Sequence, residues 1–288
     1  MRRVKRQQLK QVSNLKTFTI VSWSRAAETM EKSEDCILID KQHGLVGVFD
    51  GIGGRGNGRL ASHLGAQTIG RQWKYLRTFI RPINKAHIAF LLQGLVKQAD
   101  EKIASVEIPT GQRRPGTTVV LAALFSDRGK ASLTYAYVGD SRMYLVRVGR
   151  IQRLTEDDGY FSFAFQKGFL KQEDIQRIEQ ADDHTTLSGK DLEHFEKRNK
   201  ITCAVGWKDF SVVHTRSLDL LDNDCIILCT DGIHDNLTDQ EIEDQMSNGP
   251  FATSAQRLVQ AAYQRSQQGQ RRSKHDDISA VVILASHT

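Results

Sequence analysis

The 288-residue sequence lacks the features of a secreted disulfide scaffold and of a membrane protein. Its four cysteines form neither a CxxC pair nor a dense framework, which favours reduced thiols in a protein core. No stretch reaches the roughly 18 apolar residues that a membrane-spanning helix needs. We therefore expect no membrane span and a cytoplasmic location, or a nuclear one if the source is eukaryotic.

Several catalytic motifs are also missing. The glycines within 51–58 do not form the phosphate-binding pattern GxxxxGK[ST], and no GxSxG nucleophile elbow is present. A GxGxxG match covers 51–56, but the β-rich runs that follow lack the alternating helices of a dinucleotide-binding fold. The nine histidines are scattered and show no zinc-site spacing. These absences argue against P-loop, dinucleotide-dependent and zinc chemistry.

The charge balance is mildly basic, with 40 Lys and Arg against 34 Asp and Glu, a net charge of +6. Basic residues crowd the first ten positions, but no apolar segment follows them, so residues 1–16 are interpreted as a solvated tail and not as a secretory signal. With no aromatic platform or known nucleic-acid module, we expect no nucleic-acid partner. Residues 17–288 have an ordinary globular composition and are predicted to form a single domain, expected to be monomeric.

Hydrophobic periodicity indicates an α+β protein. Helical patterns cover 59–79, 85–106, 239–246 and 252–268. Strand patterns cover 18–23, 36–40, 45–49, 117–125, 132–138, 142–148, 201–204, 211–217, 225–229 and 278–284. The three strands within 117–148 are separated by short turns and predict an antiparallel meander. Residues 158–200 are predicted to be a flap-like insertion of short helices and loops, and the basic, Gln-rich 264–274 an exposed loop.

Acidic residues recur where the apolar runs begin or end. They are Glu34, Asp35, Asp50, Asp140, Asp231 and Asp276. Any single Asp-Gly pair is usually a turn. A carboxylate beside a buried strand is nevertheless costly unless water or a cation neutralises it, and several that converge suit a hard divalent metal. The absence of a histidine cluster favours Mg²⁺ or Mn²⁺ over zinc.

An ordered series of motifs then resembles the protein phosphatase 2C family, the metal-dependent Ser/Thr protein phosphatases. The motifs are 50–54, 61–62, 116–118, 138–142, 154–157, 229–233 and 276–279, and the resemblance spans about residues 18–286. It implies an antiparallel β-sandwich flanked by helices on both faces, a four-layer αββα arrangement. It also implies a hydrolase that acts on phosphoserine and phosphothreonine of phosphorylated proteins, in signalling by dephosphorylation.

The resemblance further implies a centre of two Mg²⁺ or Mn²⁺ ions. By motif position the metal ligands are Glu34, Asp35, Asp50, Gly51, Asp140, Asp231, Asp235 and Asp276. Within this set, Asp50 bridges the two ions, Glu34 and Asp35 act through water, and Asp140, Asp231 and Asp235 hold a third, weaker ion. The catalytic residues are then Asp50, Asp231 and Asp276, around a metal-activated water.

The sequence also departs from the family pattern. Met30 stands where the family commonly carries an arginine that binds the phosphate, which leaves Arg25 or Lys32 as candidate substitutes. Asp277 replaces a frequent asparagine. The leading hypothesis is an active Mg/Mn-dependent protein serine/threonine phosphatase. The alternative is a catalytically weak pseudophosphatase that binds phosphoproteins or a regulatory partner.

Overall fold

The computed structural model describes residues 18–27, 32–53, 56–79, 84–127, 130–181, 187, 189–208, 210, 212–270 and 272–286. The tail at 1–16 and Met30 lie outside the described residues, as do Gly54 and parts of the insertion at 158–200. None of the described helices is long and apolar enough to cross a membrane.

Two five-stranded antiparallel sheets pack face to face. The first contains, in spatial order, β1 (Phe18–Arg25), β12 (Ile278–Ala285), β11 (Cys225–Cys229), β8 (Arg142–Arg147) and β9 (Arg150–Arg153). The second contains β10 (His214–Asp219), β7 (Lys130–Val138), β6 (Val119–Asp127), β3 (Leu45–Phe49) and β2 (Cys36–Asp40). A short pair joins β4 (Gly51–Ile52) to β5 (Gly116–Thr117).

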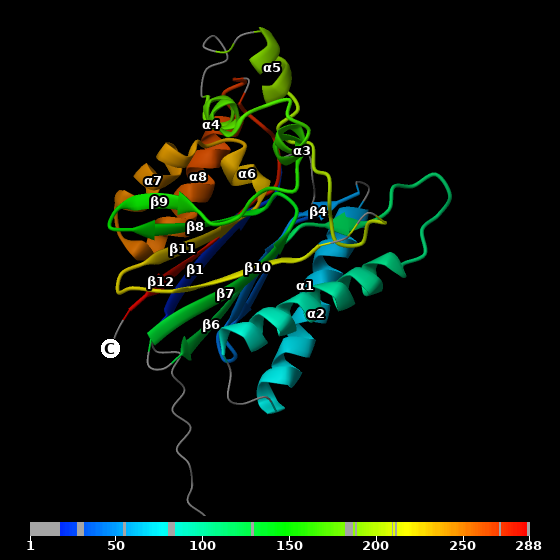
Figure 1. The fold of residues 1–288 in the computed structure, drawn as a ribbon, viewed down its shortest axis with the longest axis vertical. Coiled ribbons are helices and arrows are strands. Elements are labelled where there is room, and N and C mark those ends of the chain that lie inside the picture. Colours follow the sequence, from blue (N-terminus) through cyan, green and yellow to red (C-terminus); the bar gives the residue numbers. More distant parts are fainter. Residues whose placement is uncertain are drawn as a thin grey trace, which may run out of the picture.

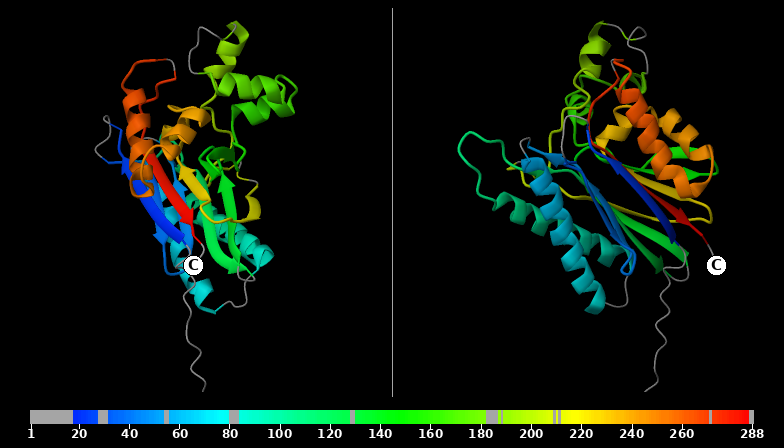
Figure 2. Two further views of the ribbon diagram at one scale, coloured as in Figure 1. Left: turned by 90° about the vertical axis from the view of Figure 1, so that its left-hand side faces the viewer. Right: turned by 180° about the vertical axis from the view of Figure 1, so that it is seen from behind.

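Helices cover both outer faces of this sandwich (Figures 1 and 2). On one face, α1 (Asn57–Phe79) and α2 (Lys85–Ala104) lie over the second sheet. On the other, α7 (Asp239–Ser247), the 3₁₀ turn at Phe251–Thr253 and α8 (Ser254–Ser266) lie over the first. The predicted α+β, four-layer αββα architecture is confirmed.

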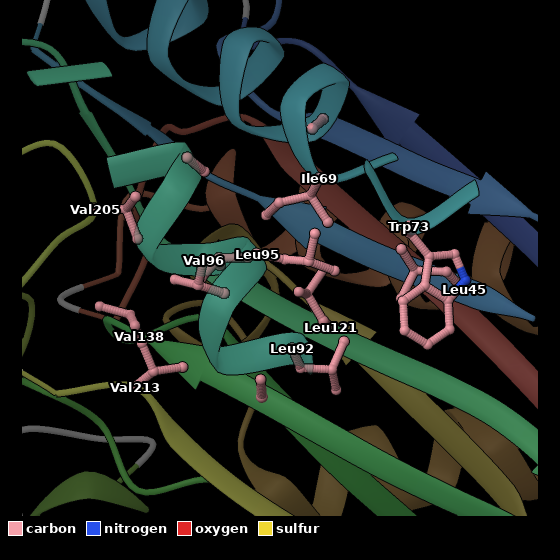
Figure 3. Close-up of a cluster of buried hydrophobic side chains, with 14 of the residues drawn as sticks. Leu45, Ile69, Trp73, Leu92, Leu95, Val96, Leu121, Val138, Val205 and Val213 are labelled. Atoms are coloured by element: carbon pink, nitrogen blue, oxygen red, sulfur yellow. The ribbon is translucent and has the colours of Figure 1, made fainter. Parts of the chain in front are cut away.

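Strand β6 shows why the central strands are apolar throughout. Val120, Ala122 and Leu124 face the other sheet, whereas Val119, Leu121 and Ala123 pack against the helices. Side chains alternate between the two faces of a strand, and here both faces are buried. Figure 3 shows the helix side of this core, where residues from α1 and α2 meet those of the sheet.

The predicted meander over 117–148 is wrong at one point. β6 and β7 form a hairpin, but β8 pairs with β11 and β9 in the other sheet. The chain therefore crosses between sheets at residues 139–141, where Gly139 has φ 97°. A turn signal indicates that a strand ends, but it does not say which strand the next one will pair with. This crossing places Asp140 at the end of the sandwich.

The insertion at 158–200 contains the predicted short helices, α3 (Tyr160–Gln166), α4 (Gln172–Glu179) and α5 (Gly189–Phe195). They share a small core of their own that includes Phe161, Ile178 and Phe195. The strand predicted at 201–204 forms only an isolated bridge between Gly159 and Ile201, while β9 was not predicted. All four cysteines are free thiols, as expected.

Candidate metal centre

Strand register brings the predicted acidic residues together. Cys36 pairs with Phe49 at the ends of β2 and β3, so Asp35 and Asp50 leave the second sheet side by side. In the first sheet, Cys229 pairs with Ala280 on one side and Arg142 on the other. The segments that carry Asp140, Asp231 and Asp276 therefore end beside one another. Asp231 opens the one-turn helix α6 (Asp231–His234).

Two threonines fix the main chain of Asp50. The amide of Asp50 donates to Thr118 Oγ1 at 3.0 Å. The carbonyl of Asp50 accepts from the Thr118 amide at 2.9 Å and from Thr117 Oγ1 at 2.8 Å. The motif at 116–118 thus positions a candidate ligand and leaves the carboxylate of Asp50 free for other partners.

The acidic pair is held by the neighbouring strands. Both oxygens of Asp277 accept main-chain amides, that of Ala27 at 2.7 Å and that of Glu34 at 2.6 Å. Thr230 Oγ1 donates to Asp35 Oδ2 at 2.9 Å. Asp277 is only 5 % exposed, so its carboxylate fastens the segment of Glu34 to the start of β12.

The main chains of Gly51 and Gly58 are in close contact. A Cβ on Gly51 would lie 2.3 Å from the carbonyl oxygen of Gly58, and one on Gly58 would lie 2.5 Å from that of Gly51. Any side chain here would therefore push α1 away from β4. This contact keeps the Gly51 carbonyl, predicted to be a ligand, packed beside the first turn of α1 and the main chain of Glu34.

Lys274 lies in the middle of the acidic side chains. Its ammonium forms ion pairs with Asp235 Oδ2 and Asp276 Oδ2, each at 2.9 Å, and with Asp231 Oδ2. Burial alone would lower the pKa of Lys274, but the three carboxylates outweigh it and raise this pKa well above its ordinary value. The interpretation of 264–274 as an exposed loop is confirmed for 267–270 but wrong at both ends: 264–266 belong to α8, and Arg272 is 2 % exposed.

Burial and mutual repulsion dominate the electrostatics of the cluster. Burial raises the pKa of Asp50 well above its ordinary range, and the charges of Asp231, Asp35, Asp276 and Asp140 add to the effect. Burial also raises the pKa of Asp231, to about 7, with Lys274 opposing the rise. A carboxylate whose pKa is raised by burial and like charges is stabilised by any added cation.

The donor set fits a hard divalent cation. Buried oxygens without a hydrogen-bond partner include Glu34 Oε1, Asp35 Oδ1 and Asp231 Oδ1. With the side chains in their present positions, no group of three His, Cys, Asp or Glu residues in the described ranges surrounds a common metal position. Asp231, Asp235 and Asp276 instead converge on the ammonium of Lys274. The site thus has the oxygen ligands and the excess negative charge that Mg²⁺ and Mn²⁺ require.

Arg25, predicted as a phosphate ligand, packs against α8. Its guanidinium carbon is 3.3 Å from the centroid of the Tyr263 ring on α8. Lys32 is exposed. A role of Arg25 in catalysis stays a prediction, and the stacking contact gives the side chain a different partner.

Three features of the site were not predicted from the sequence. They are the ammonium of Lys274, the double amide contact of Asp277 and the bond from His234 Nε2 to the carbonyl of Asp140 at 3.0 Å. For Lys274 a signal was available. In an extended segment, residues two apart face the same side, so Lys274 shares a side with Asp276.

Solved structures show which class of protein has this fold. The serine/threonine phosphatase PstP/Ppp of Mycobacterium tuberculosis superposes with a TM-score of 0.72 at 22% identity, over 94% of this chain and 99% of that one. A second structure, the catalytic domain of PstP in complex with two manganese ions, gives a TM-score of 0.70 at 21% identity and the same coverage. The chain thus shares the fold of serine/threonine phosphatases.

The sequence comparisons give the family. The protein phosphatase 2C model matches residues 31–284. Protein phosphatase PhpP of Streptococcus pneumoniae serotype 2 is 25% identical over 219 residues, which are 76% of this chain and 79% of that protein. The chain belongs to the protein phosphatase 2C family, as its motifs predicted, and this family acts on phosphorylated proteins.

Proposed function

We propose that this protein hydrolyses phosphoserine and phosphothreonine in proteins, with a water activated at a centre of two Mg²⁺ or Mn²⁺ ions. The observation that carries the proposal is the convergence of buried and partly buried, incompletely neutralised carboxylates at one end of the sandwich, in a chain of the protein phosphatase 2C family. Buried carboxylates cost stability unless a cation compensates them. Their presence together therefore supports a role in metal binding.

The acidic residues have different proposed roles in metal binding. Asp50, the carbonyl of Gly51, Asp231 and Asp276 would hold the two ions, with Glu34 and Asp35 acting through metal-bound water. Such a pair of ions lowers the pKa of a bound water and neutralises charge on the phosphoryl oxygens. The third, weaker metal position that the family resemblance implies corresponds to Asp140, Asp231 and Asp235, the last two of which contact Lys274.

The surrounding groups keep these ligands in place. Thr117 and Thr118 hold the main chain of Asp50, and Thr230 and Asp277 hold the acidic pair. Ligands fixed by hydrogen bonds lose little conformational freedom on binding a metal. The segments that carry the candidate ligands are thus fixed by groups that themselves need not touch the metal or the phosphoprotein.

The insertion at 158–200 is proposed to contact the phosphoprotein. Helices α3, α4 and α5 stand beyond the end of the sandwich where α6 lies (Figure 1). Residues 17–288 would then act as one catalytic domain, with the acidic cluster in the sandwich and the protein-recognition surface in the insertion.

Hydrolysis of a phosphothreonine peptide with Mn²⁺, with Mg²⁺ and with EDTA tests the proposal, with Asp231→Asn assayed in parallel. We expect turnover that needs the divalent ion and falls by roughly a hundredfold or more in the variant, the usual effect of losing an electrostatic group at a reacting centre. Turnover that persists in EDTA would contradict the metal mechanism.

The alternative is a pseudophosphatase that binds phosphoproteins without turning them over. The contact of Arg25 with Tyr263 favours this alternative, because the contact occupies a side chain that was a candidate for binding the phosphate. A folded protein that binds Mn²⁺ and a phosphothreonine peptide but leaves the peptide intact would establish this alternative. Measurable turnover by the same preparation would remove it.

A further inference from the structure

Lys274 differs from a surface lysine in how its main chain is held. Its amide donates to Asn236 Oδ1 at 2.9 Å, and its carbonyl accepts from Asn236 Nδ2 at 3.0 Å. Asn236 is fully buried and follows directly after Asp235. The main chain of Lys274 is therefore fixed beside one of the acidic residues that its side chain contacts.

Arg272 anchors the same segment from the other side. Its guanidinium donates to the carbonyls of His234 at 2.8 Å and Leu237 at 3.0 Å, which flank Asp235. It also donates to the carbonyl of Glu179 at 2.8 Å. The segment 272–274 is thus attached to α6 and to α4, and the position of Lys274 does not depend on its ion pairs alone.

The ammonium of Lys274 lies within ion-pair distance of three carboxylates, those of Asp231, Asp235 and Asp276. It donates a hydrogen bond to Asp231 Oδ2, whereas Asp235 Oδ2 has no hydrogen-bond partner. A lysine ammonium is a compact point charge, closer in shape to a metal ion than the planar guanidinium of arginine. Its side chain is 24% exposed, so solvent screens these pairs only partly.

The same oxygens belong to the proposed third metal site. Asp231 and Asp235 supply two of its three carboxylates, and Asp231 Oδ2 and Asp235 Oδ2 already contact the ammonium. The ammonium also contacts Asp276 Oδ2, but the other oxygen of Asp231, Oδ1, has no hydrogen-bond partner and stays open to the two-metal centre. A divalent ion bound between these two oxygens would lie within a few ångströms of a fixed positive charge. Like charges at such a distance repel strongly in a partly buried site.

We propose that the ammonium of Lys274 takes the place of the third divalent cation in this protein, so that its centre binds two metal ions and no third. The inference rests on the proposed function, because it presupposes the two-metal centre. Lys274 serves as a built-in counter-ion of Asp231 and Asp235. These carboxylates are then neutralised without a weakly bound metal ion, whose occupancy would depend on the metal concentration.

Metal stoichiometry tests the inference directly. Metal-free protein is dialysed against a series of Mn²⁺ concentrations, and bound manganese per chain is measured for the wild type and for Lys274→Met. We expect two ions in the wild type and three in the variant, because the apolar side chain vacates the oxygens of Asp231 and Asp235. Equal stoichiometry in the two proteins would overturn the inference.

Three further variants make the result specific. Lys274→Arg keeps the charge and should retain the wild-type stoichiometry. Lys85→Met removes a lysine of similar exposure, 32%, that pairs with Asp219 far from the site, and should also bind two ions. Asp235→Asn combined with Lys274→Met removes a ligand of the new site and should return the count to two. A double variant that still binds three would place the extra ion elsewhere and contradict the inference.

The thermal unfolding temperature gives a readout that does not require turnover. Mn²⁺ should raise it more in Lys274→Met than in the wild type, because the variant has an additional site. If Lys274→Met does not fold without metal, Lys274→Gln is used for both measurements, since its amide cannot replace the charge.

The failure of the inference can be told apart from that of the proposed function. A wild-type protein that binds no Mn²⁺ would refute the proposed function. A wild type and a Lys274→Met variant that both bind two ions would refute the inference alone. If the variant instead keeps two ions and its KM for a phosphothreonine peptide rises tenfold, Lys274 contacts the phosphoprotein, and the inference is also refuted.

Discussion

Two clusters of buried charge flank the start of β8 and are neutralised differently. In one, Arg142 and Arg153 contact Asp157 and Glu179, two cations against two carboxylates. In the other, Asp35, Asp50, Asp140, Asp231, Asp235 and Asp276 gather at the strand ends, and among the described residues Lys274 forms ion pairs with three of them, Asp231, Asp235 and Asp276.

The pKa values of Glu179 and Asp231 show the effect of this difference in neutralisation. Burial alone would raise the pKa of Glu179, but Arg142 and Arg153 outweigh it and lower this pKa to about 2. Burial raises the pKa of Asp231 to about 7, because Lys274 offsets only part of the effect of burial and of its acidic neighbours. The ion pairs of Glu179 thus stabilise the fold, whereas the acidic cluster lowers stability and is proposed to provide cation binding.

Asp50→Asn should have the largest effect on the acidic cluster. The amide removes a partly buried charge that Asp231, Asp35 and Asp276 oppose, so stability in EDTA is retained or increased. Phosphatase activity in Mn²⁺ should fall by roughly a hundredfold or more. Steady-state kinetics and urea unfolding measure the two effects, with the exposed Asp244→Asn as the control. A variant that stays active, or one that loses stability as it loses activity, would contradict the proposed division between the clusters.

Glu179→Gln should instead weaken the balanced cluster. The lowered pKa of Glu179 corresponds to stabilisation on the order of 3 kcal/mol at pH 7. Because the folded-state pKa lies below the unfolded value, this contribution is present above about pH 4.5 and is lost as the pH falls toward about 2. Urea unfolding at a series of pH values should show the wild type and the variant converging in acid. A difference independent of pH would point to lost packing and not to the ion pairs.

Mn²⁺ should stabilise the protein through the acidic cluster. At a hundred times the dissociation constant, one bound ion contributes about 2.7 kcal/mol to the free energy of unfolding. Thermal unfolding with Mn²⁺ and with EDTA measures this effect. Asp50→Asn should lose most of it and Glu179→Gln should keep it, since Glu179 lies in the other cluster. An equal response of the two variants would show that the metal binds elsewhere.

Asp277→Asn should have the smallest effect. An asparagine can accept one of the two amides, from Ala27 or from Glu34, but its NH₂ group cannot accept the other. We expect a loss of about 1 kcal/mol in the free energy of unfolding, the usual net value of a hydrogen bond. A loss of several kcal/mol in urea unfolding would mean that Asp277 does more than hold the acidic pair.

The sequence predicted the strands best where their ends were marked by a change of chemistry. The runs at 36–40, 45–49 and 225–229 match β2, β3 and β11 to the residue, because each apolar run meets a carboxylate or a polar turn. The crossing at 139–141 was missed, since pairing between sheets depends on long-range packing that a local turn does not encode.

The acidic residues were identified through their positions at strand ends and the family resemblance, and the register of the strands explains why they meet. The partners of these residues were harder to predict. Lys274 and Arg272 belong to a basic, Gln-rich stretch whose composition is typical of an exposed loop, yet both are bound to buried groups. Composition reports average exposure, and it cannot reveal which single cation a distant acidic cluster will attract.

The most direct test of the central claim is a crystal structure of the wild-type protein grown with Mn²⁺, with anomalous scattering measured at the manganese edge. We expect two anomalous peaks among Asp50, Asp231 and Asp276, with one of them against the carbonyl of Gly51. Full occupancy of manganese elsewhere, with no peak among these carboxylates, would contradict it.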